Sequence, residues 1–187
     1  MSAMLAGVSI VSPALAVVNF DYVTVGNPGN AADPATGSVY GAVAYQYRIA
    51  KNETTISQYV EFLNAVAAVP AGSYQTDLWN SSMSSNPYTD GIARSGAGTL
   101  GNPYSYSAIG SGNRPVAYVS WFDAARFVNW MHNGQGGAST ETGVYALNGA
   151  TSGIFTAQPG ATIWLPTESE WYKAAYYDPT KNSGAGG

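Results

Sequence analysis

The sequence predicts a fold in which short apolar strands lead into capped helices. Three observations support this prediction: a capping box occurs three times, an apolar segment precedes each box, and apolar residues at helical spacing follow it. In a capping box, a Ser or Thr hydroxyl accepts a hydrogen bond from the amide of the third helical residue, whose side chain accepts from the cap amide. Each box therefore predicts where a helix begins.

The first residues have the form of an export signal. Residues 3–11 are an apolar run, Pro13 breaks it, and Ala14-Leu15-Ala16 is a small-x-small site for signal peptidase. The run is too short to span a bilayer, and it lacks a basic segment before it. The alternative is an apolar first strand, in which residues 8–11 form a buried edge. We expect residues 1–16 to be a signal peptide and residues 17–187 to belong to a single exported domain.

Two strands and two turns are expected before the first helix. Residues 20–25 alternate enough in polarity to form a strand, and residues 41–49 form a second one. Between them, residues 26–30 and 33–37 are turn sequences, in which Gly supplies a positive φ and Pro fixes its own φ. The first capping box follows at Thr55 and Gln58. It precedes residues that share one helical face: Tyr59, Phe62, Leu63 and Val66.

The second capping box is formed by Ser120 and Asp123, with Asp where Glu is more usual. The apolar residues 115–119 predict a strand that leads into it. The helix that follows, residues 121–130, is apolar on most sides, so we expect it to be buried. His132 comes at its end, where an imidazole commonly interacts with the last carbonyls of a helix. Residues 133–160 are rich in turn residues, and we expect a hairpin around residues 144–147.

The third capping box joins Thr167 to Glu170 and predicts a helix that begins at Glu168. Trp164-Leu165 has the pattern of a strand end, and Pro166 stops it. Apolar residues at three- and four-residue spacing are expected to lie against a core: Trp171, Ala174 and Ala175. The two glutamates suit the positive end of the helix dipole, so we interpret them as helix-start residues rather than a catalytic carboxylate pair.

Three motifs, in this order, carry a resemblance to a known family. They are Tyr47-Arg48-Ile49-Ala50-Lys51-Asn52-Glu53-Thr54-Thr55 with Gln58-Tyr59 and Phe62-Leu63, then Arg114-Pro115-Val116 with Val119-Ser120-Trp121 and Asp123-Ala124-Ala125, then Leu165-Pro166-Thr167-Glu168 with Glu170-Trp171 and Ala174-Ala175. The chain resembles the sulfatase-modifying-factor family, the formylglycine-generating-enzyme domain, from about Val39 to its end. The resemblance implies an irregular α+β fold related to C-type lectins, and it extends to exported bacterial members. It also implies that residues 17–187 are the N-terminal portion of a single sulfatase-modifying-factor-like domain.

The chain departs from the family at two places. It has Glu53-Thr54-Thr55-Ile56 where the family usually has Glu-Val-Thr-Asn, so the Asn is missing but the Thr cap is kept. It also contains no Cys, whereas the family's oxidases act through a cysteine pair in their C-terminal part. The resemblance implies copper or calcium as cofactors, with ligands in the C-terminal part that this chain lacks. No residue of this chain is expected to be catalytic or to bind a metal.

Because of these departures, the sequence predicts two alternative functions. The first expectation is an exported domain protein that is non-catalytic as present here and that binds a ligand. The alternative is a formylglycine-generating-type oxidase of a sulfatase Cys or Ser, with its cysteines beyond Gly187. The resemblance implies a sulfatase peptide or a small ligand such as a carbohydrate as partner, and a location in the periplasm, at the cell surface or outside the cell. Only 10% of the residues are charged, as is common on secreted proteins.

The candidate ligand-binding residues lie between residues 71 and 113, a segment rich in Tyr, Ser, Asn and Gly. They are four aromatic residues: Trp79, Tyr88, Tyr104 and Tyr106. Rigid aromatics among small polar residues are typical of recognition loops, where the rings supply contact area. The alternative is a family loop that packs on the core. A net charge of -4 and a sequence pI near 4.7 argue against a nucleic-acid partner, since no basic patch is available to neutralise phosphates.

Overall fold

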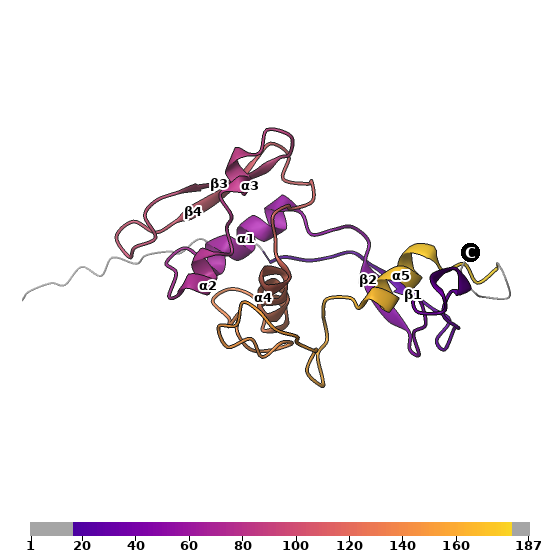
Figure 1. The fold of residues 1–187 in the computed structure, drawn as a ribbon. Helices are drawn as coiled ribbons and strands as arrows, with labels where there is room; N and C mark the ends of the chain where they lie inside the picture. The colour runs from indigo at the N-terminus through magenta and orange to yellow at the C-terminus, as the bar shows by residue number, and fades with distance from the viewer. Residues whose placement is uncertain (1–16, 181–187) are drawn as a thin grey trace, which may run out of the picture.

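The computed structural model describes residues 17–180, so the predicted signal peptide, residues 1–16, lies outside the described residues. Helices and two small antiparallel sheets make up the described part, which agrees with the predicted α+β class. They gather in two lobes (Figure 1). The helical lobe contains α1 to α4 with β3 and β4, and the ribbon lobe contains β1, β2, the 3-10 turn and α5. No helix among residues 17–180 is long and apolar enough to cross a membrane.

The helical lobe is built on α1 (Ile56–Val66) and α4 (Trp121–His132). Beside them lie β3 (Gly91–Ser95) and β4 (Ser105–Ile109), which pair antiparallel with Gly91 opposite Ile109, and the short helices α2 (Ser73–Thr76) and α3 (Ser82–Ser85). Aromatic rings from α1 and α4 form its centre: Tyr59, Phe62, Phe127 and Trp130. The Phe62 ring lies 5.3 Å from both the Phe127 and the Trp130 rings. Burial of these large rings is the main apolar contribution to this lobe.

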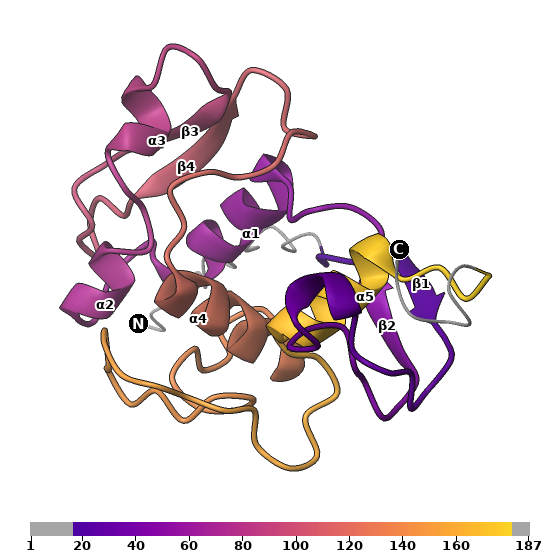
Figure 2. The ribbon, with the colours of Figure 1, turned by 45° about the vertical axis from the view of Figure 1, so that its right-hand side comes forward.

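The ribbon lobe pairs β1 (Tyr22–Val25) with β2 (Tyr47–Ala50) antiparallel, with Tyr22 opposite Ala50. A 3-10 turn (Pro34–Thr36) lies between the strands in sequence, and Asp33 caps it by accepting from the Ala35 amide. Helix α5 (Glu168–Tyr176) packs on this ribbon from the far end of the chain (Figure 2). The ribbon lobe therefore joins residues near 30 with residues near 170.

All three predicted capping boxes are present, and each helix begins at the expected residue. Thr55 and Gln58 cap α1, Ser120 and Asp123 cap α4, and Thr167 and Glu170 cap α5. The missing family Asn therefore leaves the start of α1 intact. The prediction that α4 is buried is confirmed from Ala125 to Trp130.

The predicted strands are shorter than expected, and two are absent. The strand expected at residues 41–49 is formed only from Tyr47, and residues 115–119 make a single bridge between Pro115 and Thr55. Tyr118 has a φ of 61°, which takes the chain out of the extended conformation. Residues 162–167 are likewise not a strand. Residues 144–147 form no hairpin, and the Asn129 side chain of α4 bonds the backbone of Tyr145 instead.

The face of α5 that is buried differs from the prediction. Trp171 is 52% exposed, and Ala174 and Ala175 are exposed as well. The buried residues are instead Glu170 and Lys173, each 1% exposed. Helix α5 packs against polar groups of the ribbon lobe rather than against an apolar core. The prediction that Trp171 fills a core site is therefore wrong.

Candidate functional site

A cleft of about 820 Å³ lies between the two lobes. One wall is α4 with the start of α1, and the other is β1 and β2 with residues 162–166 and the start of α5. Ligand sites in proteins are concave, mostly apolar and of 300 to 1,000 Å³ or so, with a few polar groups placed among the apolar ones. The cleft has this size and this composition, so it is the candidate functional site.

The wall formed by the helical lobe is apolar, and we call it the floor of the cleft. Phe127 and Val128 of α4 contribute to it, with Tyr59 of α1, and Phe20 packs edge-on against Phe127 at 6.2 Å. Tyr59 is 1% exposed, and its hydroxyl donates to the Leu78 carbonyl at 2.9 Å. The floor is thus held rigidly by the same aromatic cluster that stabilises the helical lobe.

The opposite wall is held by the buried carboxylate of Glu170. Its oxygens accept from the Thr167 amide at 2.7 Å, the Thr167 hydroxyl at 2.9 Å and the Trp164 indole N–H at 3.0 Å. The Tyr45 hydroxyl also donates to it at 2.8 Å. A buried carboxylate is stable only when several donors satisfy it. Glu170 therefore does more than cap α5: it fastens residues 164–167 to the segment that precedes β2.

Two phenols complete this wall from the β2 side. The hydroxyl of Tyr47, a buried residue, donates to the backbone carbonyl of Glu170. Burial, and then the negative charge of Glu170, raise the pKa of Tyr47 to about 12. Burial and the hydrogen bond to Glu170 likewise raise the pKa of Tyr45. Both phenols therefore stay protonated near neutral pH and act as hydrogen-bond donors.

The rim of the cleft carries charged side chains from β2 and the loop after it. Arg48, Lys51 and Glu53 line this rim, and all three are exposed. The Arg48 guanidinium lies 5.3 Å from the centre of the Tyr22 ring. Within residues 17–180, the ion pairs are Arg114 with Asp90 and Arg126 with Glu141, so the rim cations have no acidic partner. They are available to a bound group.

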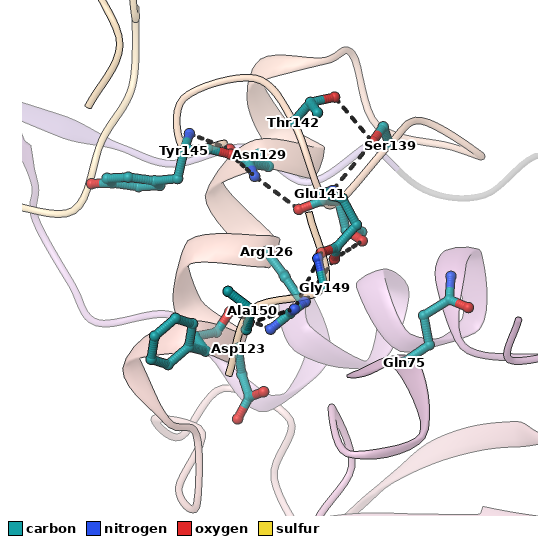
Figure 3. Close-up of polar contacts among 12 residues, drawn as sticks. Gln75, Asp123, Arg126, Asn129, Ser139, Glu141, Thr142, Tyr145, Gly149 and Ala150 are labelled. Atoms are coloured by element: carbon teal, nitrogen blue, oxygen red, sulfur yellow. Dashed lines mark hydrogen bonds and ion pairs between the residues drawn. The ribbon is translucent and has the colours of Figure 1, made fainter. Parts of the chain in front are cut away.

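Behind α4, a polar network fixes the long loop that borders the cleft. Figure 3 shows Arg126 of α4 directed at Glu141, with Nε 2.7 Å from Oε1 and Nη2 3.2 Å from Oε2. Arg126 is 1% exposed and also donates to the Ala150 carbonyl at 3.0 Å. The paired geometry of guanidinium and carboxylate makes this contact directional as well as charged. It ties residues 141–150 to α4.

Asn129 connects the same network to the cleft. Its amide nitrogen donates to the Thr140 and Tyr145 carbonyls, both at 2.8 Å, and its oxygen accepts from the Tyr145 amide at 2.8 Å (Figure 3). The Tyr145 hydroxyl in turn accepts from the amide of Leu165, which lines the cleft, at 3.0 Å. Polar contacts thus continue from α4 to the segment that forms the cleft wall.

His132 does not interact with the last carbonyls of its helix as expected. Its Nδ1 lies 3.2 Å from the hydroxyl of Thr162, which lines the cleft. The helix end is closed instead by the Asn133 amide, which donates to the Asn129 carbonyl at 2.9 Å. Because Asn133 already satisfies this turn, the imidazole is free to turn toward residues 162–166.

The four aromatic residues proposed from the sequence lie outside the cleft lining. Trp79 and Tyr104 enclose the Arg94 guanidinium, which lies 3.9 and 4.4 Å from the two ring centres. Tyr106 is 3% exposed, and its hydroxyl donates to the Ala67 carbonyl at 3.2 Å. Tyr88 is 90% exposed in the loop before β3. The structure thus brings three of the four together around Arg94 and leaves Tyr88 apart.

The residues that line the cleft were not identified as a site from the sequence. In the sequence, Arg48 and Lys51 stand out only as part of a motif, and Trp164 only as part of a strand end. Residues of all three motifs line the cleft, and this clustering would have identified the site. It can be seen only in the tertiary structure. Sequence spacing alone does not give it.

The cofactors that the resemblance implies do not fit the residues present. The chain has no Cys, so it supplies no thiolate for copper. Across residues 17–180, no three side chains of His, Cys, Asp or Glu come together in a way that could hold a metal ion. We therefore assign neither copper nor calcium to these residues.

Comparison with known proteins identifies one related family. The family model described as the sulfatase-modifying factor enzyme 1-like domain matches residues 24–183, which is most of the chain. No curated protein and no solved structure matches the chain. The family match covers all the described elements of both lobes except the first two residues of β1.

Proposed function

This chain belongs to the sulfatase-modifying factor enzyme 1-like family, and on that premise we propose that it is an exported binding module whose ligand lies in the cleft. A C-type-lectin-like arrangement of its α+β elements is part of the proposal. The observation that carries it is the cleft itself: about 820 Å³, with an apolar floor and two exposed cations without acidic partners among the described residues. These features suit recognition.

The non-catalytic part of the proposal rests on the side chains that the chain supplies. The resemblance implies oxidases that act through a cysteine pair, and these 187 residues contain no Cys. The buried carboxylate in the cleft wall, Glu170, already accepts hydrogen bonds from Thr167, Trp164 and Tyr45. It is used to hold the wall, so it is poorly placed to exchange a proton with a ligand.

The ligand class that we propose is peptide rather than carbohydrate. None of the four aromatic candidates for a sugar surface lines the cleft: Arg94 covers one face each of Trp79 and Tyr104, and Tyr106 is buried. The cleft instead combines an apolar floor with charged and amide groups along a strand, which suits a polypeptide segment such as a sulfatase peptide. Of the four sequence candidates, Tyr88 is retained as an exposed contact residue on a separate surface.

The test uses two tryptophans of similar exposure. Trp171 lines the cleft and is 52% exposed, whereas Trp121 is 42% exposed and does not line it. The full chain is titrated with fluorescein-labelled sulfatase-type peptides and, separately, with labelled oligosaccharides, and fluorescence anisotropy is read. We expect peptide binding that Trp171→Ala weakens about tenfold and Trp121→Ala leaves within about twofold. Equal loss in both variants, or binding of oligosaccharides alone, would contradict the proposal.

A second candidate function is oxidation of a sulfatase Cys or Ser. The family match over residues 24–183 and the order of the three motifs favour it. It requires a thiolate pair supplied by sequence outside these 187 residues. Incubation of the native, full-length gene product with copper and a Cys-containing sulfatase peptide, followed by mass spectrometry and hydrazide labelling, would detect the aldehyde product. Aldehyde formation would replace the binding-module proposal with this one.

A further inference from the structure

The hydrogen-bond pattern of the ribbon shows which way each residue of β2 turns its backbone. The Lys51 amide donates to the Asp21 carbonyl at 2.8 Å, directly across the ladder. In an antiparallel pair, hydrogen-bonded residue pairs alternate with pairs that do not bond each other. Ile49 opposite Val23 is therefore also a bonded pair. Arg48 and Ala50, which lie between these positions, turn their N–H and C=O groups away from β1.

That outer edge of β2 is open and faces the cleft. No backbone hydrogen bond to Arg48 or Ala50 exists on this edge within the described part of the chain. Every residue from 46 to 54 lines the cleft, whereas β1 contributes only alternate residues. The strand that borders the cleft is therefore β2. A strand edge with unpaired N–H and C=O groups is a template for one more strand.

The charges along this edge indicate what kind of strand fits. Arg48 and Lys51 are exposed and have no acidic partner among residues 17–180, and Glu53 is the one exposed carboxylate in the lining. The rim is thus locally positive, although the whole chain carries a formal net charge of -4. A peptide carboxylate is complementary to this rim, and apolar side chains are complementary to the floor at Phe127 and Val128.

We propose that β2 binds, along its free edge, an extended peptide that carries both apolar and acidic side chains. The peptide adds a third strand to the ribbon: its main chain pairs with Arg48 and Ala50, a carboxylate meets Arg48 or Lys51, and apolar side chains contact the floor. This inference rests on the proposed function and specifies how the peptide is held. Main-chain pairing supplies affinity, and the charges and the floor supply selectivity.

The experiment tests whether binding depends on the backbone N–H groups of only every second peptide residue. The probe is a fluorescein-labelled octapeptide, Glu-Val-Thr-Val-Glu-Val-Thr-Val, titrated with the full chain. Two matched peptides carry N-methyl groups at the odd or at the even residues, and a third has Lys in place of Glu. We expect one N-methylated peptide to lose at least tenfold in affinity and the other to lose less than threefold, because only one set of amides faces β2. The Lys peptide should bind at least fivefold more weakly.

Variants of the protein, rather than of the peptide, test the same edge of β2. Ala50→Pro removes an N–H that points away from β1, so the ladder to β1 is kept, and circular dichroism melting checks that the variant folds. We expect peptide affinity to fall at least tenfold. Arg48→Glu with Lys51→Glu should reverse the preference in favour of the Lys peptide. Arg114→Glu, a change of an exposed arginine outside the cleft lining, is the matched control and should keep the preference of the parent chain.

The outcomes separate this inference from the proposed function. Binding that is equally sensitive, or equally insensitive, to both N-methylated peptides overturns strand addition while leaving the cleft as a peptide site. An unchanged charge preference in the double reversal shows that Arg48 and Lys51 do not select the peptide, and it overturns the charge part of the inference. Absence of binding by any peptide, with binding of an oligosaccharide, overturns both proposals.

Discussion

Helices α4 and α5 begin with the same capping box, yet they are buried in opposite ways. Helix α4 buries an unbroken run from Ala125 to Trp130 in an apolar core. Helix α5 buries only Glu170 and Lys173 and leaves Trp171 52% exposed. The first residues of each helix are determined locally, but the buried face is determined by what packs against it. Two helices that look alike in sequence therefore contribute to stability through different interactions.

The difference extends to how each lobe satisfies its charges. In α5, the Lys173 ammonium donates to the Asn27 carbonyl at 2.8 Å, and burial lowers its pKa. In α4, the buried Arg126 is paired with Glu141. In the ribbon lobe, the buried Lys173 and Glu170 are hydrogen-bonded to neutral groups, among them a backbone carbonyl and a phenol. In the helical lobe, the buried cation Arg126 is paired with a carboxylate.

The largest effect is expected in the apolar core of the helical lobe. Trp130 is 1% exposed, and its ring contacts the Phe62 and Phe127 rings. Trp130→Ala should lower the free energy of unfolding by about 3 to 5 kcal/mol, because it removes a buried ring and leaves a cavity. Urea denaturation followed by circular dichroism measures this. A loss below about 1 kcal/mol would show that the core of this lobe collapses around the gap.

The next effect concerns the carboxylate that holds the ribbon lobe. Glu170→Gln should lower the free energy of unfolding by about 2 to 3 kcal/mol, because the amide group replaces an acceptor that three donor residues require. Glu168→Gln is the control: it lies in the same first turn but is exposed, so the loss should stay below about 1 kcal/mol. Equal losses in the two variants would mean that only the helix dipole matters.

Alkaline pH should weaken the same lobe. Burial and the charge of Glu170 raise the pKa of Tyr47 to about 12, above the value of about 10 in an unfolded chain. Between these values the folded protein keeps a proton that the unfolded chain has lost, so the stabilisation is complete below pH 10 or so and is lost toward pH 12 or so. The slope is at most about 1.4 kcal/mol per pH unit. Denaturation series in this range should show a shallower slope for Tyr47→Phe; an identical slope would contradict the assignment.

The smallest effect is expected for the tryptophan of α5. Trp171 is half-exposed and contacts the Tyr176 ring at 6.0 Å. Trp171→Ala should lower the free energy of unfolding by no more than about 1 kcal/mol, in contrast to Trp130→Ala. Parallel thermal melts of the two variants give the comparison directly. Similar shifts would show that both helices bury an apolar face in solution.

The sequence was sufficient for features that depend on neighbouring residues. Thr55 with Gln58, and Thr167 with Glu170, lie within one helical turn, so their hydrogen bonds could be predicted without the rest of the fold. The α+β class followed from the resemblance to the family, and the helix starts agree with it. The strand expected at residues 115–119 failed because an apolar run does not reveal that Tyr118 adopts a positive φ.

The cleft could not be predicted in this way because its walls come from distant parts of the chain. Tyr45 and Glu170, which hold one wall, are 125 positions apart, and no local pattern relates them. The aromatic residues at 79 and 104 looked suitable for a ligand, but Arg94 fills the space between their rings. Composition alone did not show that these two rings pack on a neighbouring side chain.

The long-range bonds of α5 also determine when the cleft is formed during synthesis. The hydrogen bonds that hold α5 to the ribbon lobe join residues that are 123, 125, 139 and 146 positions apart in the sequence. The hydrogen bond between Asn64 of α1 and Tyr106 of β4 joins residues only 42 positions apart. A chain emerging from the ribosome can assemble the helical lobe first, since domains form as their residues become available. The wall that contains β1 and β2 is completed only after α5 has been made. Premature termination before residue 168 would therefore leave a folded core whose second wall lacks Glu170, the residue that holds it.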